Sequence, residues 1–269
     1  MAIRLRGGAE FLHIPKTGGS WVETVLDQNG LIDRYLGHKH ATYDANLLGA
    51  TLTGRDQVPR AAKTVFGRLV RLGRAPHKPR PREETHPPVT EPLRFCFVRH
   101  PLAWLESFWR YQSGRGWKRL QGVEGSPDYW HPMAVLNGLG GGEFVPFVEN
   151  LLARRPGYVS ELFLSFAKAD VAIVGRNESL RDDLAVVLDR LGLAYDRATV
   201  FDSERVNQAK RSREGVDWPE SLREDTMRAE LIGLAHFGYL SDEERERLGV
   251  GERIGTHPGL IEHSPTDAA

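Results

Sequence analysis

One pattern of apolar and polar positions occurs three times along the chain: a short apolar run, a turn, and then a helix with one apolar face. The apolar runs are residues 11–14, 95–98 and 171–174, and the helices after them are expected from about residue 21, from Pro101, and around Leu184. Short apolar runs that alternate with amphipathic helices are typical of buried parallel strands. The pattern therefore predicts an α/β fold with a mainly parallel central sheet flanked by helices. Two further helices are expected at residues 143–152 and 219–236.

Length and composition favour a single soluble domain. The chain has 269 residues, 40% of them hydrophobic, which is enough for one substantial core over residues 1–248. Residues 249–269 are expected to form a poorly ordered tail. The single cysteine, Cys96, excludes an intramolecular disulfide and a cysteine-based metal cluster. No apolar run suits a signal peptide or a membrane span, so a cytoplasmic location is the simplest expectation.

The charges balance overall but are uneven along the chain. Lys+Arg and Asp+Glu both number 36, which gives no reason to expect nucleic acid as a partner. Residues 55–82, within a basic and proline-rich insertion at about 55–90, carry nine basic side chains against Asp56 alone, a formal charge of +8. Three readings stay open for this segment: a solvated helix, a peripheral contact with a membrane surface, or a lid that attracts an anionic glycan or lipid acceptor.

The turn after the first apolar run has the composition of an anion-binding loop. Gly18 and Gly19 allow the backbone to curl until several N–H groups point at one spot, at the start of a helix. Lys16 adds a positive charge, and Thr17 and Ser20 add hydroxyl donors. We expect this loop to hold a phosphate-like group. It is not the P-loop of kinases and GTPases, because its lysine precedes both glycines.

The second repeat of the pattern places another cation at the end of a strand. Arg99 follows the apolar run 95–98, and Ser107 lies about two turns into the next helix. Ligands of α/β proteins bind at the carboxyl ends of the strands, where both side chains can face one cleft. Arginine suits a phosphate because its planar fork donates paired hydrogen bonds. The alternative is that Arg99 is a structural ion-pair partner and Ser107 a surface residue.

Both segments resemble motifs of sulfotransferases that use 3′-phosphoadenosine 5′-phosphosulfate (PAPS). The stretch Pro-Lys-Thr-Gly-Gly-Ser, residues 15–20, resembles the 5′-phosphosulfate loop of carbohydrate sulfotransferases and their bacterial relatives. Arg99 and Ser107 resemble the 3′-phosphate motif of the same enzymes, although His100 and Trp104 depart from it, since Asp or Asn and a second arginine are common at those places. The segment Val-Gly-Arg-Asn-Glu-Ser-Leu after residue 173 extends the resemblance, patchily, from residue 11 to about residue 210.

The resemblance implies a P-loop-like nucleotide-binding fold and transfer of a sulfuryl group from PAPS to an acceptor hydroxyl on a glycan, a glycolipid or a small alcohol, without a metal. Lys16 would neutralise charge on the bridging oxygen, and His40, preferred over His38, would accept the acceptor proton. Lys210 and Arg211 would reach the 3′-phosphate. The alternatives are a non-catalytic nucleotide-binding protein and a nucleotide-dependent phosphotransferase, for which neither a glycine-lysine P-loop nor a metal-holding acidic strand end is evident.

Overall fold

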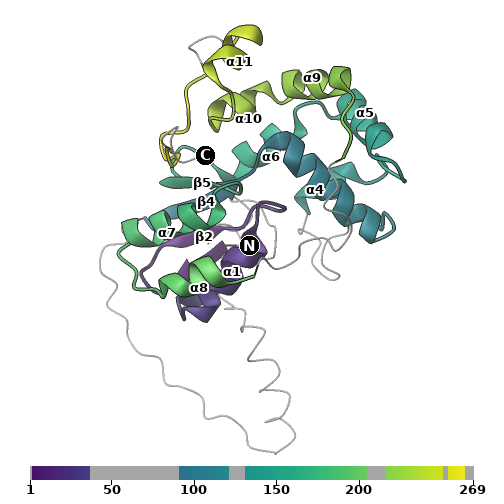
Figure 1. Cartoon of the computed structure of the whole chain (residues 1–269). Coiled ribbons are helices and arrows are strands. Elements are labelled where there is room, and N and C mark those ends of the chain that lie inside the picture. Colours follow the sequence, from purple (N-terminus) through teal and green to yellow (C-terminus); the bar gives the residue numbers. More distant parts are fainter. Residues whose placement is uncertain (1, 37–90, 121–130, 205–215, 251–253, 264–269) are drawn as a thin grey trace, which may run out of the picture.

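A computed structural model of the chain describes residues 2–36, 91–120, 131–204, 216–250 and 254–263. The described elements surround one five-stranded sheet (Figure 1). They are, in chain order, β1 (Ala2–Leu5), β2 (Glu10–Leu12), α1 (Gly19–Gln28), β3 (Ile32–Leu36), β4 (Arg94–Val98), α4 (Pro101–Gly114), the 3₁₀ helix η2 (Pro132–Leu136), α5 (Phe144–Arg154), α6 (Tyr158–Phe166), β5 (Ile173–Arg176), α7 (Leu180–Arg190), α8 (Arg197–Asp202), α9 (Glu220–Ala229), α10 (Leu231–His236) and α11 (Asp242–Arg247).

The fold is α/β, as predicted, but the sheet is mixed, so the prediction of a mainly parallel sheet was wrong. The strand order is β3-β1-β2-β4-β5. β2 pairs with β4 and β4 with β5 in parallel, whereas β1 is antiparallel to both of its neighbours. The reason lies in the first twelve residues, where a turn with Gly8 at φ 83° folds β2 back along β1. Arg4, in the middle of β1, pairs with Glu10, which in turn pairs with the buried Arg94 of β4.

Alternate strand residues supply two hydrophobic cores, one on each face of the sheet. On one face, α1, α7 and α8 cover a core that includes Ile3, Phe11, Phe95, Phe97 and Ile173. On the other, α4, α5 and α6 cover Ala2, Leu12, Cys96, Val98 and Val174. Successive side chains of a strand point to opposite faces of the sheet, so both faces bury apolar residues under helices. The result is three layers with the sheet in the middle (Figure 1). α9, α10 and the residues that flank α11 add a smaller cluster beside α4.

The three predicted strand–turn–helix units are confirmed, with boundaries shifted by one or two residues. β2 leads into α1, β4 into α4, and β5 into α7. α4 begins where the sequence places Pro101, and the His100 side chain caps it by accepting a hydrogen bond from the N–H of Leu102. Proline suits the first helical turn because the N–H that it lacks has no intrahelical partner there.

The helix expected over residues 219–236 is divided into α9 and α10. The division falls at Glu230, whose carboxylate accepts hydrogen bonds from the N–H groups of Val159 and Ser160 and from the Ser160 hydroxyl, at 2.6–3.0 Å. Glu230 thereby caps the start of α6 from within the core, where it is fully buried. Its partners are some 70 residues away in the sequence, so no local pattern indicates the break.

Part of the expected tail packs against the sheet. Leu260 forms an isolated parallel bridge with Val174 of β5, and Ile261 is buried. Nε2 of His263 lies 2.7 Å from Oδ1 of Asp183, a carboxylate that has no exposed surface. These contacts fix residues 254–263 to β5 and α7. None of the helices in the described ranges has the length and apolarity needed to cross a bilayer.

Candidate active site

The loop of residues 15–20 connects β2 to α1 at the carboxyl end of the strand. Lys16 has φ 69° and Gly18 has φ 88°, so two of its residues adopt the left-handed conformation. α1 begins at Gly19, and the N–H groups of Trp21 and Val22 both donate to the carbonyl of Gly18. Within the described chain, no backbone carbonyl accepts from the N–H groups of Gly18, Gly19 or Ser20. These amides are available to an anion.

Close packing around the loop requires both glycines. A Cβ on Gly19 would lie 2.2 Å from Cδ2 of His13, a buried ring that stacks on Phe11. A Cβ on Gly18 would lie 2.5 Å from the Leu180 side chain, at the start of α7. The loop is therefore packed against His13, just after β2, and against Leu180 of α7, so a side chain at either glycine would force a shift in the packing.

The two hydroxyls expected to act as donors differ in their surroundings. Thr17 is buried, and its hydroxyl donates to the carbonyl of Ile14 at 3.0 Å. Its side chain therefore braces the loop, and only its backbone can serve a ligand. Ser20 lies half-buried in the first turn of α1, beside the available amides.

Arg99 meets this loop across the sheet, because β2 and β4 are parallel neighbours and both end at the same edge. Its Nη1 lies 3.4 Å from the backbone carbonyl of Lys16. Its Nε is buried and makes no hydrogen bond within the described chain. Burial lowers the pKa of the Arg99 guanidinium, while Glu178 and Glu106 act in the opposite direction. A buried donor without a partner is costly, and a bound anion would remove that cost.

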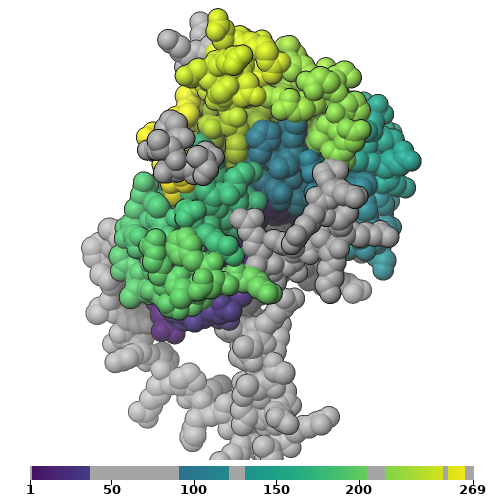
Figure 2. All heavy atoms as spheres, in the orientation of Figure 1, coloured from purple at the N-terminus to yellow at the C-terminus, as the bar shows by residue number. Residues whose placement is uncertain are grey.

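The gap between β2 and β4 is also the switch point of the sheet. The chain leaves β2 through α1 toward β3 on one side, and leaves β4 through α4 toward β5 on the other. The two helices lie on opposite faces of the sheet, and ligands of α/β sheets bind at such a switch point, outside the carboxyl ends of the strands. Figure 2 shows the molecule in the same orientation as Figure 1, with the blue segment that contains α4 between the green segment that contains α7 and the yellow-green segment that contains α9.

One face of α4 follows the loop. The indole N–H of Trp104 donates to the carbonyl of Pro15 at 2.9 Å, and the ring of Tyr111 lies 4.5 Å from Nζ of Lys16. Ser107 falls between them at helical spacing, so it lies on the same face. It is half-buried. Trp104, which departs from the sulfotransferase motif, thus supports the loop backbone where an arginine would add charge.

Lys16 is the most perturbed cation of the site. Burial, and to a lesser degree the neighbouring charge of Arg99, lower the pKa of its ammonium to about 8. No carboxylate lies within 4 Å of it among the described residues. A half-buried ammonium without a carboxylate counter-ion favours an incoming anion.

A further polar group, which was not among the predicted site residues, lies beside Arg99. Glu178 accepts hydrogen bonds from the backbone N–H of His100 at 2.9 Å and from the hydroxyl of Tyr239 at 3.0 Å. It joins the ends of β4 and β5 to the segment after α10. The sequence signals for Glu178 were its position just beyond an apolar strand and its place in the Val-Gly-Arg-Asn-Glu-Ser-Leu segment, to which no site role was given.

The structure brings together the predicted residues 16–20, Arg99 and Ser107. The histidines His38 and His40 and the basic residues Lys210 and Arg211 lie outside the described residues, as does the segment 55–82. No cluster of three or more His, Cys, Asp or Glu side chains suited to a metal ion occurs in the described parts of the chain.

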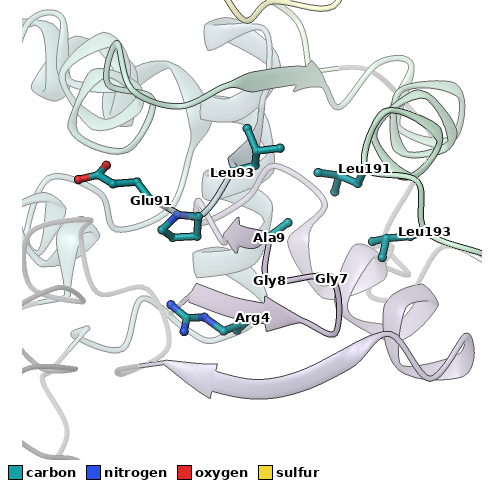
Figure 3. Close-up of a pocket in the computed structure, with 9 residues that line it drawn as sticks. Arg4, Gly7, Gly8, Ala9, Glu91, Leu93, Leu191 and Leu193 are labelled. Atoms are coloured by element: carbon teal, nitrogen blue, oxygen red, sulfur yellow. The ribbon is translucent and has the colours of Figure 1, made fainter. Parts of the chain in front are cut away.

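A separate pocket lies at the opposite edge of the sheet, around the amino ends of β2 and β4 (Figure 3). Its lining includes Gly7, Leu93 and Leu193, with Arg4 as the basic side chain among the described residues. Arg4 already pairs with Glu10. This pocket therefore lacks the convergent free donors found at the carboxyl edge. Comparison of the chain with models of protein families, with curated proteins and with solved structures gave no match.

Proposed function

We propose that the protein is a PAPS-dependent sulfotransferase whose donor site lies at the carboxyl ends of β2 and β4. The observation that carries the proposal is the meeting of the two motifs, with the Arg99 guanidinium 3.4 Å from the carbonyl of Lys16 at the switch point of the sheet. The motifs are 83 residues apart, and only a parallel pairing of their strands brings them together. The P-loop-like sulfotransferase fold is part of the same proposal.

The residues of the site suit a doubly phosphorylated nucleotide. The free amides of Gly18, Gly19 and Ser20 lie at the start of α1, where a 5′-phosphate would be favoured. Arg99 carries a buried, unpartnered Nε beside them, and Ser107 lies on the face of α4 that follows the loop. These two would distinguish a 3′-phosphate from the bare ribose of ADP.

PAPS would supply the sulfuryl group, whose bond to the phosphate oxygen breaks as a bond from sulfur to the acceptor oxygen forms. Lys16 would stabilise the negative charge that develops on the phosphate oxygen, a contact stronger in the transition state than in the ground state. His40 would accept the proton released from the acceptor hydroxyl. The acceptor is a glycan, a glycolipid or a small alcohol.

The donor site is tested by calorimetric titration of the full chain with 3′-phosphoadenosine 5′-phosphate (PAP), with ADP as the comparison. Each charge-assisted phosphate contact contributes about 1.5–3 kcal/mol, so PAP should bind more than tenfold more tightly than ADP. Arg99→Ala should abolish the preference, whereas Arg154→Ala, an exposed arginine in α5, should preserve it. Equal affinities for PAP and ADP would refute the site and reopen the phosphotransferase alternative.

Catalysis is tested by the transfer of a radiolabelled sulfuryl group from PAPS to a panel of sugars and simple alcohols. Lys16→Ala should retain the fold and lose transfer. Tight PAP binding without transfer to any acceptor, or to water, would favour the non-catalytic nucleotide-binding protein.

A further inference from the structure

Lys16 depends on one neighbouring side chain for the placement of its ammonium. Its Nζ lies over the ring of Tyr111, 4.5 Å from the ring centre, and within the described chain it has no carboxylate partner. The face of an aromatic ring attracts a cation, most strongly where water is scarce. Since Lys16 is largely buried beside Arg99, the ring is the group that offsets the lost hydration and the repulsion.

We propose that Tyr111 is a positioning residue that holds the Lys16 ammonium at the mouth of the 15–20 loop, an inference that rests on the sulfuryl transfer proposed above. Tyr111 lies against the loop through the Lys16 side chain. It acts through Lys16, and its role is to keep the ammonium where charge develops.

The geometry of α4 supports this role. Trp104 fixes the loop backbone at Pro15, and Tyr111, seven residues further, fixes the side chain of Lys16. Seven residues of helix span about 10 Å, so the two anchors bracket the loop from one rigid element. Lys16 has φ 69°, a conformation strained for a residue with a side chain, and two anchors from one helix help to maintain it.

The ring of Tyr111 is itself held in place. Nη1 of Arg115, the residue that follows the last residue of α4, donates to the Tyr111 hydroxyl at 2.8 Å. The side chain of Tyr111 is 37% exposed, so packing alone leaves it room to turn. The ring face is thus the essential part, and the hydroxyl serves only its orientation.

The first test detects the contact itself. Reductive methylation with ¹³C-formaldehyde labels the seven lysines of the full chain, and Lys16→Arg assigns the Lys16 signal. A ring current from Tyr111 should move this signal upfield of the other lysine signals. The displacement should vanish in Tyr111→Leu and persist in Tyr111→Phe and in the control Tyr195→Leu, which changes a ring in the segment after α7. A Lys16 signal that Tyr111→Leu leaves unmoved would overturn the proposal.

The second test measures turnover as PAP released from PAPS. Tyr111→Leu should lower kcat about tenfold with little change in the KM for PAPS, and Tyr111→Phe should restore most of the rate. In a Lys16→Ala background, Tyr111→Leu should have no further effect, and a further loss there would overturn the positioning role. If the wild type released no PAP, the sulfotransferase proposal would fail, and the lysine signal would still decide whether Tyr111 positions Lys16.

Discussion

Gly19 offers the sharpest test of the loop because a methyl group at this position would clash with a buried side chain. Its Cβ would lie 2.2, 2.4 and 2.8 Å from Cδ2, Nε2 and Cγ of His13. The His13 ring is 2% exposed and stacks on Phe11 at 6.0 Å between ring centres, so it cannot move aside freely. Overpacking of this kind costs about 1–3 kcal/mol. An alanine also restricts the unfolded chain more than a glycine does, which stabilises the folded protein by about 0.4–1 kcal/mol and offsets part of this cost.

Gly19→Ala should therefore lower the free energy of unfolding by about 1–2 kcal/mol, which corresponds to a fall in Tm of about 2–8 °C for a domain of this size. The assay is thermal unfolding followed by circular dichroism. Gly114→Ala is the matched control, since a Cβ at that position, the last residue of α4, meets nothing within 4 Å. Combining Gly19→Ala with His13→Ala should remove the extra cost. Equal Tm values for Gly19→Ala and Gly114→Ala would refute the reasoning.

Three other predictions follow from the site and its supports. The pKa of Lys16 without ligand is about 8, and the charged ammonium binds the anion better, so PAP affinity should fall as pH rises through 8. Lys16 should take up a proton when PAP binds, which calorimetry in buffers of different ionisation enthalpy would measure. Glu230→Gln replaces a buried hydrogen-bond acceptor with a donor, so it should lower the free energy of unfolding by about 1–3 kcal/mol, measured in urea. The control Glu161→Gln changes an exposed carboxylate and should lower it by less than about 0.5 kcal/mol. Trp104→Phe should free the Pro15 carbonyl and weaken PAP binding in the same titration, whereas unchanged affinity would show that the indole bond does not support the loop.

Local signals were sufficient for the elements that carry the site. Four-residue apolar runs followed by a 3.6-residue period marked β2–α1 and β4–α4, and Pro101 marked the start of α4. Parallel strands end at one edge, so the sequence also placed Arg99 beside the 15–20 loop. His40, Lys210 and Arg211 stay predictions.

The features that were not predicted from the sequence depend on contacts between residues far apart in the chain. β1 is four residues long with a charged residue inside it, so its period of two was too short to recognise, and Arg4 is tolerated there only because Glu10 pairs with it. The supporting roles of Trp104 and Tyr111 were also missed. Their spacing with Ser107 places all three on one helix face, a signal that becomes legible only once the loop is known to lie against that face.

The bridge at Leu260 has a consequence for how the molecule behaves among its own copies. The outer edge of β5 would otherwise present free N–H and carbonyl groups to any extended chain. Val174 donates to the carbonyl of Gly259 and accepts from the N–H of Ile261, so the middle of that edge is already paired from within. The carboxyl-terminal segment thus protects the β5 edge of the sheet against strand addition, and a chain shortened before residue 259 would expose an edge on which copies could pair and aggregate.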